Sequence, residues 1–416
     1  MNELMNDFGT NNWRKHVVFF SMILMLCGVL FSRVLLSSGM VAFVTGCFIH
    51  KNLVRQLKIF FRSPFMWSMS LLFLLPLVSG LWSVNVSQWY EVLRIKLPLL
   101  LLPISFAGIN DFRARDWEKI ALVFILLAFS GVCWSLWLYL RNLRSIQEGY
   151  LQAHTIDTPL GNDHVRFSLF IAIAILTTAF LIIKYRRFYS KPFLVLLIFG
   201  FAVFVLYLHI LAVRTGLFCF YFGSLACIIA LLWNRKHKWK YALLLLGIVS
   251  LPFIFYFTLP TLKNRVSYLK YDLALVQKNI YLRGSNDGNR VISLKAGWQL
   301  LNQKPFTGIG FGDIKDEVDR YYEMYDPQRS SIDMILPSSE WMMYGAGVGL
   351  PGLVLFSFCM LIPFFLQRLR SNMAWWLLNS FMAISYLFDI GLEVQFGVFM
   401  HAFVLLWWYK WLQLQQ

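Results

Sequence analysis

Arg214 is the residue whose type and position most strongly indicate chemistry. It separates two long apolar runs, residues 193–213 and 217–233. A guanidinium at membrane depth is costly unless it is paired, so an arginine here is a functional candidate. The alternative is an anchor whose head reaches the membrane interface. We favour function, because the planar guanidinium can bind two phosphate oxygens at once.

Further arginines stand in a polar stretch that begins at Thr261. Arg290 precedes Trp298 in this stretch, and Arg265 and Arg283 come earlier. Several arginines near one membrane face could hold a pyrophosphate group. For Arg265 and Arg283, ordinary solvated charge is at least as good an interpretation. The stretch also contains acidic residues, which we interpret as a solvated face: Asp313, Asp316, Glu317, Asp319, Glu323 and Asp326.

Three more side chains are candidates for substrate contact. His164 and Arg166 lie at the start of an apolar segment, on the same side as the polar stretch, and Glu393 lies in a short turn near the C-terminus. A buried carboxylate is costly, so Glu393 either pairs with Arg214 or Arg290 or lies at the membrane interface. A lone histidine is more often a packed residue than a catalyst.

Several classes of site have no support in the sequence. The glycines at 308, 310 and 312 lack dinucleotide-binding spacing, so we interpret them as a flexible turn that follows a helix. No metal-ligand spacing and no nucleophile motif is present. We therefore expect neither a metal nor a cofactor.

Composition predicts the elements that must position these residues. Of 416 residues, 58% are hydrophobic and only 14% are charged. This predicts an all-α polytopic membrane protein. About twelve spans are expected, near residues 17–36, 38–50, 66–83, 95–109, 119–140, 166–184, 193–212, 216–233, 241–259, 341–366, 374–391 and 394–412.

Three segments follow from this pattern. Residues 1–259 would form a bundle of about nine spans, residues 260–340 one large, partly helical loop, and residues 341–416 about three further spans. Within the loop, apolar residues at helical spacing predict an amphipathic helix over 289–303 that ends before Lys304-Pro305.

The net charge of +17 comes largely from alternate short loops. That distribution follows the positive-inside rule, so it indicates cytoplasmic termini and makes a nucleic-acid partner unlikely. The large loop would then lie on the outer face, together with residues 83–94 and 141–165. The basic clusters are Lys51 to Arg62, Arg113 to Lys119, Lys184 to Lys191, Arg235 to Lys240, and Arg368 with Arg370.

Four short motifs together resemble a known family. They are Arg214-Thr215-Gly216-Leu217, Arg290 to Trp298, Pro305-Phe306-Thr307-Gly308-Ile309-Gly310, and Glu340-Trp341 to Gly352. This set resembles the O-antigen ligase and polymerase superfamily of bacterial envelope glycosyltransferases. The motifs cover only Arg214 and about 290–352, although the expected topology is similar over most of the chain.

The resemblance implies a function and its partners. The chain would transfer a glycan from undecaprenyl pyrophosphate to a lipid A-core or other glycan acceptor, at the periplasmic face of the bacterial inner membrane and in contact with membrane lipids. The reaction would be inverting and independent of metal. Arg214 and Arg290 would stabilise the leaving pyrophosphate.

One motif departs from the family pattern. The family has Pro-His-Asn before its glycine-rich span, whereas this chain has Pro337-Ser338-Ser339. A serine of ordinary pKa is a poor general base. Glu340 or His164 could take this role instead. Otherwise the protein binds its lipid-linked glycan differently, or it is a diverged, inactive member.

Two other functions remain open from the sequence. A polymerase of the same superfamily would use a carrier-linked repeat unit as its acceptor. A transporter or flippase of lipid-linked saccharide is the alternative outside the enzymes. Transporters usually carry internal repeats and ionisable residues near the middle of their spans, whereas spans such as 119–140 and 241–259 have uncharged centres. The ligase is the preferred prediction.

Overall fold

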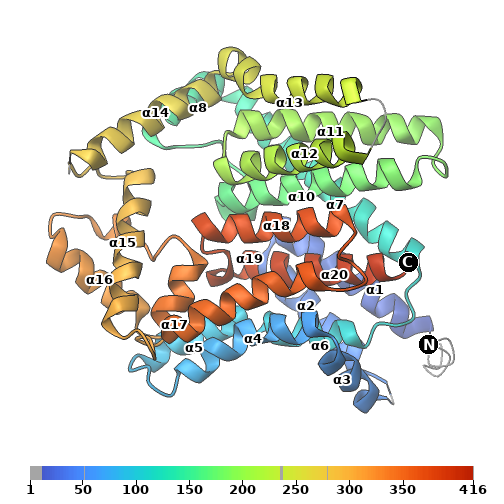
Figure 1. Cartoon of the computed structure of the whole chain (residues 1–416), viewed down its shortest axis with the longest axis horizontal. Coiled ribbons are helices and arrows are strands. Elements are labelled where there is room, and N and C mark those ends of the chain that lie inside the picture. Colours follow the sequence, from blue (N-terminus) through green and yellow to red (C-terminus); the bar gives the residue numbers. More distant parts are fainter. Residues whose placement is uncertain (1–11, 51, 235–237, 279, 416) are drawn as a thin grey trace. The chain divides into compact units, whose positions relative to one another are not determined.

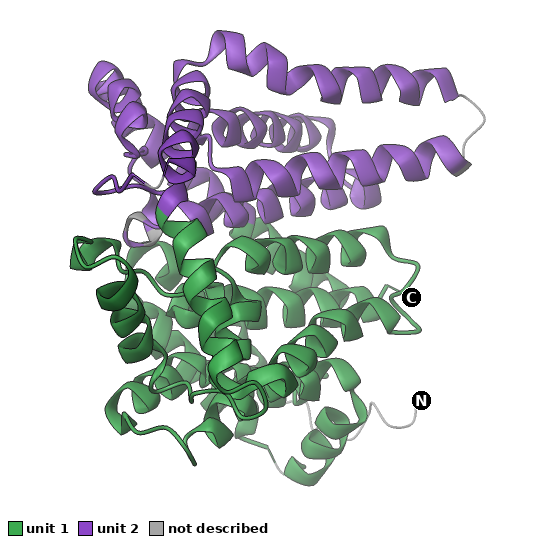
Figure 2. Cartoon of the chain, turned by 60° about the vertical axis from the view of Figure 1, so that its left-hand side comes forward, with its two compact units in different colours: residues 1–124, 289–416 green, residues 125–288 purple. Residues whose placement is uncertain are grey.

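The computed structural model describes residues 12–50, 52–234, 238–278 and 280–415. Every regular element among these residues is a helix, which confirms the all-helical prediction. The chain divides into two compact units, which Figure 2 distinguishes by colour. Unit 1 comprises Met1–Phe124 and Asn289–Gln416, and unit 2 comprises Ile125–Gly288.

Unit 1 is built from the two ends of the chain. Figure 1 labels most of its helices. They are α1 (Asn12–Phe31), α2 (Arg33–Phe48), α3 (Leu53–Arg62), α4 (Pro64–Ser79), α5 (Val86–Lys96), α6 (Pro98–Ala107), the start of α7 (Ala114–Arg141), α15 (Asp287–Gln303) from Asn289 onward, α16 (Ile314–Tyr325), α17 (Glu340–Leu361), η4 (Ile362–Phe365), α18 (Met373–Phe388), η5 (Gly391–Glu393), α19 (Gln395–Phe399), the π-helical turn η6 (Met400–Val404) and α20 (Leu405–Gln413). The short η3 (Ser331–Asp333) lies between α16 and α17.

Aromatic side chains fill the core of unit 1. The rings of Trp407 and Trp411 stack with centroids 6.0 Å apart, and both side chains are fully buried. Phe65 of α4 packs against Trp375 of α18 and Tyr409 of α20. Large buried rings in offset and edge contacts contribute much of the apolar burial in such a core. These contacts join α4, α18 and α20, which are far apart in sequence.

Helix α17 is broken inside unit 1. Gly349 has φ 76° and ψ −163°, a conformation open essentially to glycine alone, and Pro351 follows it. The turn after α15 lies against this break: Ile309 N donates to Ala346 O at 2.8 Å, and Leu350 N donates to Pro305 O at 2.7 Å. One loop carbonyl and one loop N–H thus pair with backbone groups of the broken helix.

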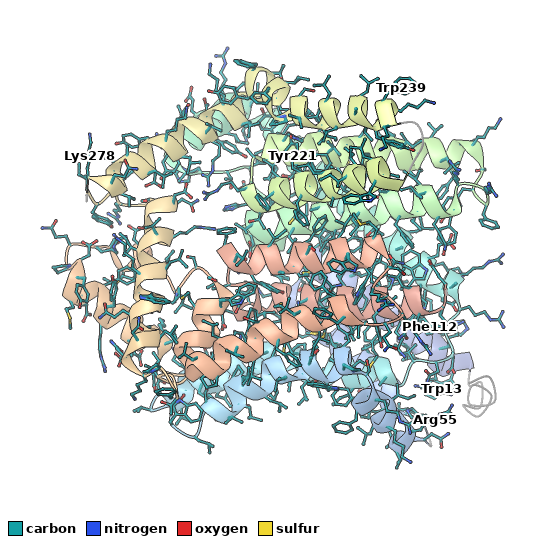
Figure 3. The ribbon with its side chains drawn as sticks, viewed as in Figure 1. Trp13, Arg55, Phe112, Tyr221, Trp239 and Lys278 are labelled. Carbon is teal, nitrogen blue, oxygen red and sulfur yellow. The ribbon has the colours of Figure 1, made fainter. Side chains whose placement is uncertain are left out.

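Unit 2 contains the rest of α7 and the middle of the chain. Its helices are α8 (Leu143–Gly149), η2 (Tyr150–Gln152), α9 (Pro159–Asn162), α10 (His164–Tyr185), α11 (Lys191–Leu211), α12 (Arg214–Asn234), α13 (Lys238–Thr258) and α14 (Pro260–Gln277). Helix α10 packs against α11 and α12, and α12 packs against α13. In Figure 3, Tyr221 marks α12 and Trp239 marks the start of α13.

Seven described helices are long and apolar enough to cross a membrane: α1 from Trp13, α7, α10, α11, α12 to Trp233, α13, and α17 with η4. The pair α2 and α3, bent by 109°, would make an eighth. Each of the twelve expected segments nevertheless coincides with a helix or a run of helices. Several are interrupted, as between α5 and α6 at Leu97, and so fall short of a full span. Arg235 and Lys236 of one basic cluster lie outside the described residues.

The expected large loop is largely helical and does not form a separate body. Helix α14 belongs to unit 2 and α16 to unit 1, and the boundary at 288/289 falls within α15. The helix expected over 289–303 is present as α15, two residues longer at its start, but its apolar residues are not concentrated on one face as expected.

Candidate functional site

Arg214 is the first residue of α12, and a two-residue connection places it there. Helix α11 ends at Leu211, and Ala212 adopts a left-handed conformation (φ 52°) while its N–H donates to Leu208 O at 3.0 Å. The hydroxyl of Tyr150 donates to Leu211 O at 2.9 Å. The last carbonyls of α11 are therefore satisfied. The connection that carries Arg214 is fixed at both helix ends.

Gly216 explains why the motif after Arg214 needs a glycine. A Cβ at this position would lie 2.8 Å from both the Cβ and the backbone oxygen of Ser168 on α10. The Gly216 N–H also donates to Ser168 Oγ at 3.1 Å. The missing side chain lets α12 approach α10 closely, which holds the first turn of α12 in place.

The guanidinium of Arg214 forms an ion pair with Asp287. Asp287 is only 4% exposed, whereas the Arg214 side chain is 49% exposed. The carboxylate thus holds one edge of the guanidinium, and the other donors face outward. Asp287 Oδ2 has no hydrogen-bond partner among the described residues, so this carboxylate can still accept a bond.

Asp272 of α14 holds Asp287 in position. Its fully buried carboxylate accepts hydrogen bonds from the N–H groups of Asp287 at 2.8 Å and Gly288 at 3.3 Å, and from the Ser285 hydroxyl at 2.6 Å. These N–H groups belong to the start of α15, where backbone donors lack partners within the helix. A carboxylate there also complements the positive end of the helix dipole.

Arg265 of α14 is the second guanidinium of this cluster. It is buried, its plane lies 5.8 Å from the Tyr268 ring, and its Nη1 has no hydrogen-bond partner among the described residues. Burial lowers the pKa of Arg265; the charge of Asp287 opposes this shift and that of Arg214 adds to it. Burial also raises the pKa of Tyr268 to about 12. Arg214 and Arg265 thus lie near the same carboxylate, that of Asp287, and both keep donors that could meet an anion.

In unit 1, the start of α15 is fixed by a polar network. Asn289 donates from Nδ2 to Asp333 Oδ1 at 2.8 Å and accepts a hydrogen bond from Arg329. Arg329 also pairs with Asp326 at 2.7 Å. Arg290 itself donates from Nη1 to Phe388 O at 2.8 Å, at the end of α18. Arg290 is therefore hydrogen-bonded to an uncharged carbonyl group within unit 1.

Ser338, which the resemblance aligns with a histidine, is paired with another serine. The hydroxyls of Ser338 and Ser293 lie 2.9 Å apart, and Ser338 N donates to Ser293 Oγ at 3.2 Å. Ser293 lies on α15, one turn after Arg290, and donates to Arg290 O at 2.9 Å. The serine pair joins α15 to the entrance of α17, a structural contact without an acidic or basic group.

Glu340 begins α17 and is fully buried. Its Oε1 accepts a hydrogen bond from Leu392 N, and its Oε2 has no hydrogen-bond partner among the described residues. Glu393, next to Leu392, forms an ion pair with Lys96 at 2.6 Å. Lys96 is fully buried and also donates to Leu392 O at 3.1 Å. The expected pairing of Glu393 with Arg214 or Arg290 is therefore wrong: its partner is Lys96.

His164 and Arg166 lie at the first turn of α10 in unit 2. Asp163 caps this helix by accepting from Arg166 N at 3.1 Å, and its carboxylate also pairs with the Arg166 side chain. Arg166 is thus engaged within its own turn. His209 of α11 accepts a hydrogen bond from Tyr221 at 2.6 Å and donates to Val205 O at 2.7 Å, as a packed histidine does.

Two interpretations of the polar stretch are corrected. The glycine turn is buried and hydrogen-bonded, not flexible: Gly310 N donates to Gly347 O at 3.1 Å. The acidic residues are not all a solvated face either. Asp313 accepts from Val84 N at 2.9 Å and Asn85 N at 2.7 Å, and so fixes the entrance of α5. Solvated charge fits Arg283, which is exposed, but not Arg265.

Sequence reasoning missed four residues of these clusters: Tyr150, Asp272, Asp287 and Lys96. Asp287 carried a usable signal, because an aspartate just before a predicted helix is a common cap. Lys96 and Asp272 carried none, since their partners lie far away in sequence. Among the described residues, no group of three His, Cys, Asp or Glu side chains could hold a metal ion.

Comparison with known proteins adds one finding. Residues 199–357 match the family model described as O-antigen ligase. This match supports the resemblance of the chain to the O-antigen ligase superfamily. Members of the family are membrane glycosyltransferase-like enzymes, ligases and polymerases. The matched stretch contains Arg214, Arg265, Arg290, Ser338 and Glu340, whereas Lys96, His164, Arg166 and Glu393 lie outside it. No curated protein matches the chain.

Proposed function

We propose that this protein transfers a glycan from undecaprenyl pyrophosphate to a lipid A-core sugar. The observation that carries the proposal is the cluster of Arg214, Asp287 and Arg265 inside the family-matched stretch. The outward donors of Arg214 and the unused Nη1 of Arg265 suit a pyrophosphate. The family match supports this class of reaction without naming the donor or the acceptor.

In the proposed reaction, a new glycosidic bond replaces the bond between the glycan and the pyrophosphate. An acceptor hydroxyl attacks the anomeric carbon of the glycan and loses its proton. The bond from that carbon to the pyrophosphate oxygen breaks, and the pyrophosphate leaves with the electron pair. Attack opposite the leaving group inverts the anomeric centre. Arg214 stabilises the charge that develops on the leaving oxygen, and Arg265 adds to the positive potential. We assign the same role to Arg290, independently of that cluster, because the resemblance implies it.

The general base is proposed to be Glu340. Ser338 is bonded to Ser293, and a hydroxyl of ordinary pKa accepts a proton poorly at neutral pH. Glu340 Oε2 is a carboxylate oxygen without a hydrogen-bond partner among the described residues. His164, Arg166 and Glu393 remain proposed substrate contacts, with Glu393 acting through the outer end of its pair with Lys96.

We place the protein in the bacterial inner membrane with cytoplasmic termini and twelve crossings. The contacts inside each unit support this sidedness. In unit 1, residues 84 and 85 meet Asp313, as expected of two outer connections. In unit 2, Asn264 donates to Gln147 O at 2.8 Å, which joins the 141–165 loop to the large loop.

The decisive experiment is surface glycan profiling of a deletion strain. The strain is complemented with the wild type, with Arg290→Ala, or with Arg283→Ala as the control, since Arg283 is an exposed arginine of the same stretch. We expect capped lipopolysaccharide to be lost, carrier-linked polymer to accumulate, and the wild type and Arg283→Ala to restore capping. Chains shortened to one repeat would instead identify a polymerase. An unchanged profile would favour a transporter.

The absence of a metal requirement is a separate part of the proposal. Guanidinium groups replace a metal as the stabiliser of the leaving group, so transfer by the purified protein should persist in EDTA. Loss of transfer in EDTA, with recovery on adding a divalent cation, would contradict it.

A further inference from the structure

Unit 1 contains a groove whose lining, apart from Glu393 at one end, takes no part in the proposed reaction. Its volume is about 750 Å³, within the usual range for ligand sites. Its walls are formed by α2, by the junction of α5 and α6, and by the turn that leads into α19. Most of the lining is aliphatic, for example Met40, Val41, Val44 and Leu101. Val41 is 67% exposed, so the groove is open along its side.

Two arginines stand at one end of this groove. Arg33 is the first residue of α2, and Arg94 lies in the last turn of α5. Both are exposed, and neither forms an ion pair with any other described residue. The guanidinium of Arg33 lies 5.6 Å from the ring of Phe396, which also lines the groove.

The acidic residue of the groove does not cancel this charge. Glu393 lines the same end, but its carboxylate is paired with the buried Lys96. The end of the groove therefore carries two uncompensated positive charges, while the remainder is apolar. This distribution matches an amphipathic molecule with an anionic head and a hydrocarbon chain.

The length of the groove indicates which amphipathic molecule it fits. Along α2 it extends from Arg33 to Thr45, which corresponds to about 18 Å at the rise of an α-helix. One leaflet of the hydrocarbon core is about 15 Å deep. The groove thus accommodates a chain that spans one leaflet, below a phosphate at the interface.

We propose that this groove binds an anionic glycerophospholipid of the surrounding leaflet. Its phosphate would lie between Arg33 and Arg94, and one acyl chain would lie against α2 and α6. Glu393, which is paired with the buried Lys96, lines the groove beside the head group. The bound lipid is a partner of the protein and not a reactant.

The test is lipid retention by the full-length protein in detergent, measured by native mass spectrometry. The probes are dioleoyl phosphatidylglycerol and dioleoyl phosphatidylcholine, offered together. The wild type should retain phosphatidylglycerol preferentially. The double variant Arg33→Gln/Arg94→Gln should lose about tenfold of that preference, because two charge-assisted contacts disappear. Arg186→Gln/Arg187→Gln removes two exposed arginines that do not line the groove and should behave as wild type.

A second variant tests the chain rather than the head group. Val44→Trp fills the groove and should lower retention of both phospholipids while the protein still elutes as a single species. Equal retention by the wild type and both groove variants would overturn the proposal. Preferential retention of a polyprenyl phosphate over phosphatidylglycerol would overturn the assigned occupant. Neither readout depends on glycan transfer, so the result is independent of the proposed function.

Discussion

At the scale of single residues, burial decides what each charged group can do. Arg214 keeps half of its side chain exposed while Asp287 holds one edge, so its remaining donors can meet a substrate. Arg265 is buried beside it with an unused Nη1. In contrast, Lys96 and Glu393 form a buried ion pair. The charge of Lys96 is thereby neutralised and does not attract an anion.

The planar, bidentate shape of the Arg214 guanidinium should contribute to catalysis as much as its charge. In Arg214→Lys the positive charge stays but the bidentate contact is lost. We expect transfer by the purified protein to fall at least about tenfold, and about 100-fold or more in Arg214→Ala. Arg187→Lys, at an exposed turn, is the control. A wild-type rate for Arg214→Lys would remove the bidentate contact from the mechanism.

The Lys96–Glu393 pair makes a prediction about stability. Lys96→Met leaves a buried carboxylate without its cation and should cost about 3–5 kcal/mol, as should Glu393→Leu. The double variant Lys96→Met/Glu393→Leu should recover most of this loss, because no charge is then left unpaired. Thermal unfolding of the four proteins in detergent gives the comparison. Strictly additive losses would show that the two groups do not stabilise each other.

At the scale of elements, close helix contacts place the site residues. The connection between α11 and α12 is two residues long, and Gly216 brings α12 against α10. Asp272 of α14 caps the start of α15 and thereby positions Asp287. Asp272 is a positioning residue, because its carboxylate is used by backbone donors and not by the guanidinium groups.

Alanine substitutions at two glycines should distinguish the destabilisation caused by a steric clash from the stabilisation caused by higher helix propensity. In Gly216→Ala the new Cβ would meet Ser168 at 2.8 Å, and such overpacking costs about 1–3 kcal/mol. Gly200→Ala in α11 meets nothing within 4 Å and should be neutral or stabilising by about 0.5–1 kcal/mol. The thermal unfolding midpoints of the two variants and the wild type, measured in one detergent, give the comparison. If both variants unfold alike, the Ser168 contact does not constrain α12.

At the scale of the whole molecule, local patterns predicted the elements and not their partners. Apolar runs located a helix in each expected segment, because a bilayer imposes composition on its helices, but only seven helices, or eight with the bent pair, are long enough to cross it. The interruptions at Leu97 and Gly349 have local causes, because each lies shortly before a proline. The burial of Arg265 instead depends on residues far along the chain, such as Tyr150. The pairing of Glu393 with Lys96 could not be predicted for the same reason.

Chemical labelling tests the proposed sidedness in both units. Ser267 of unit 2 and Ser331 of unit 1 are exposed in the large polar stretch, and Ser190 is exposed in a basic loop. Ser267→Cys and Ser331→Cys should react with an impermeant maleimide in cells whose outer membrane alone is permeable. Ser190→Cys should react only after the inner membrane is opened. The wild type, with six free cysteines, sets the background. The reverse pattern would invert the topology.

The turn after α15 has a consequence for how the protein is made. Phe311 N donates to Ser79 Oγ at 3.2 Å, and Ile309 N donates to Ala346 O at 2.8 Å. The first acceptor leaves the ribosome more than two hundred residues before the turn, and the second leaves it after the turn. The turn therefore cannot complete these hydrogen bonds until the first part of α17, which contains Ala346, has been synthesised. A truncation just before Ala346 would end synthesis with the turn unfinished.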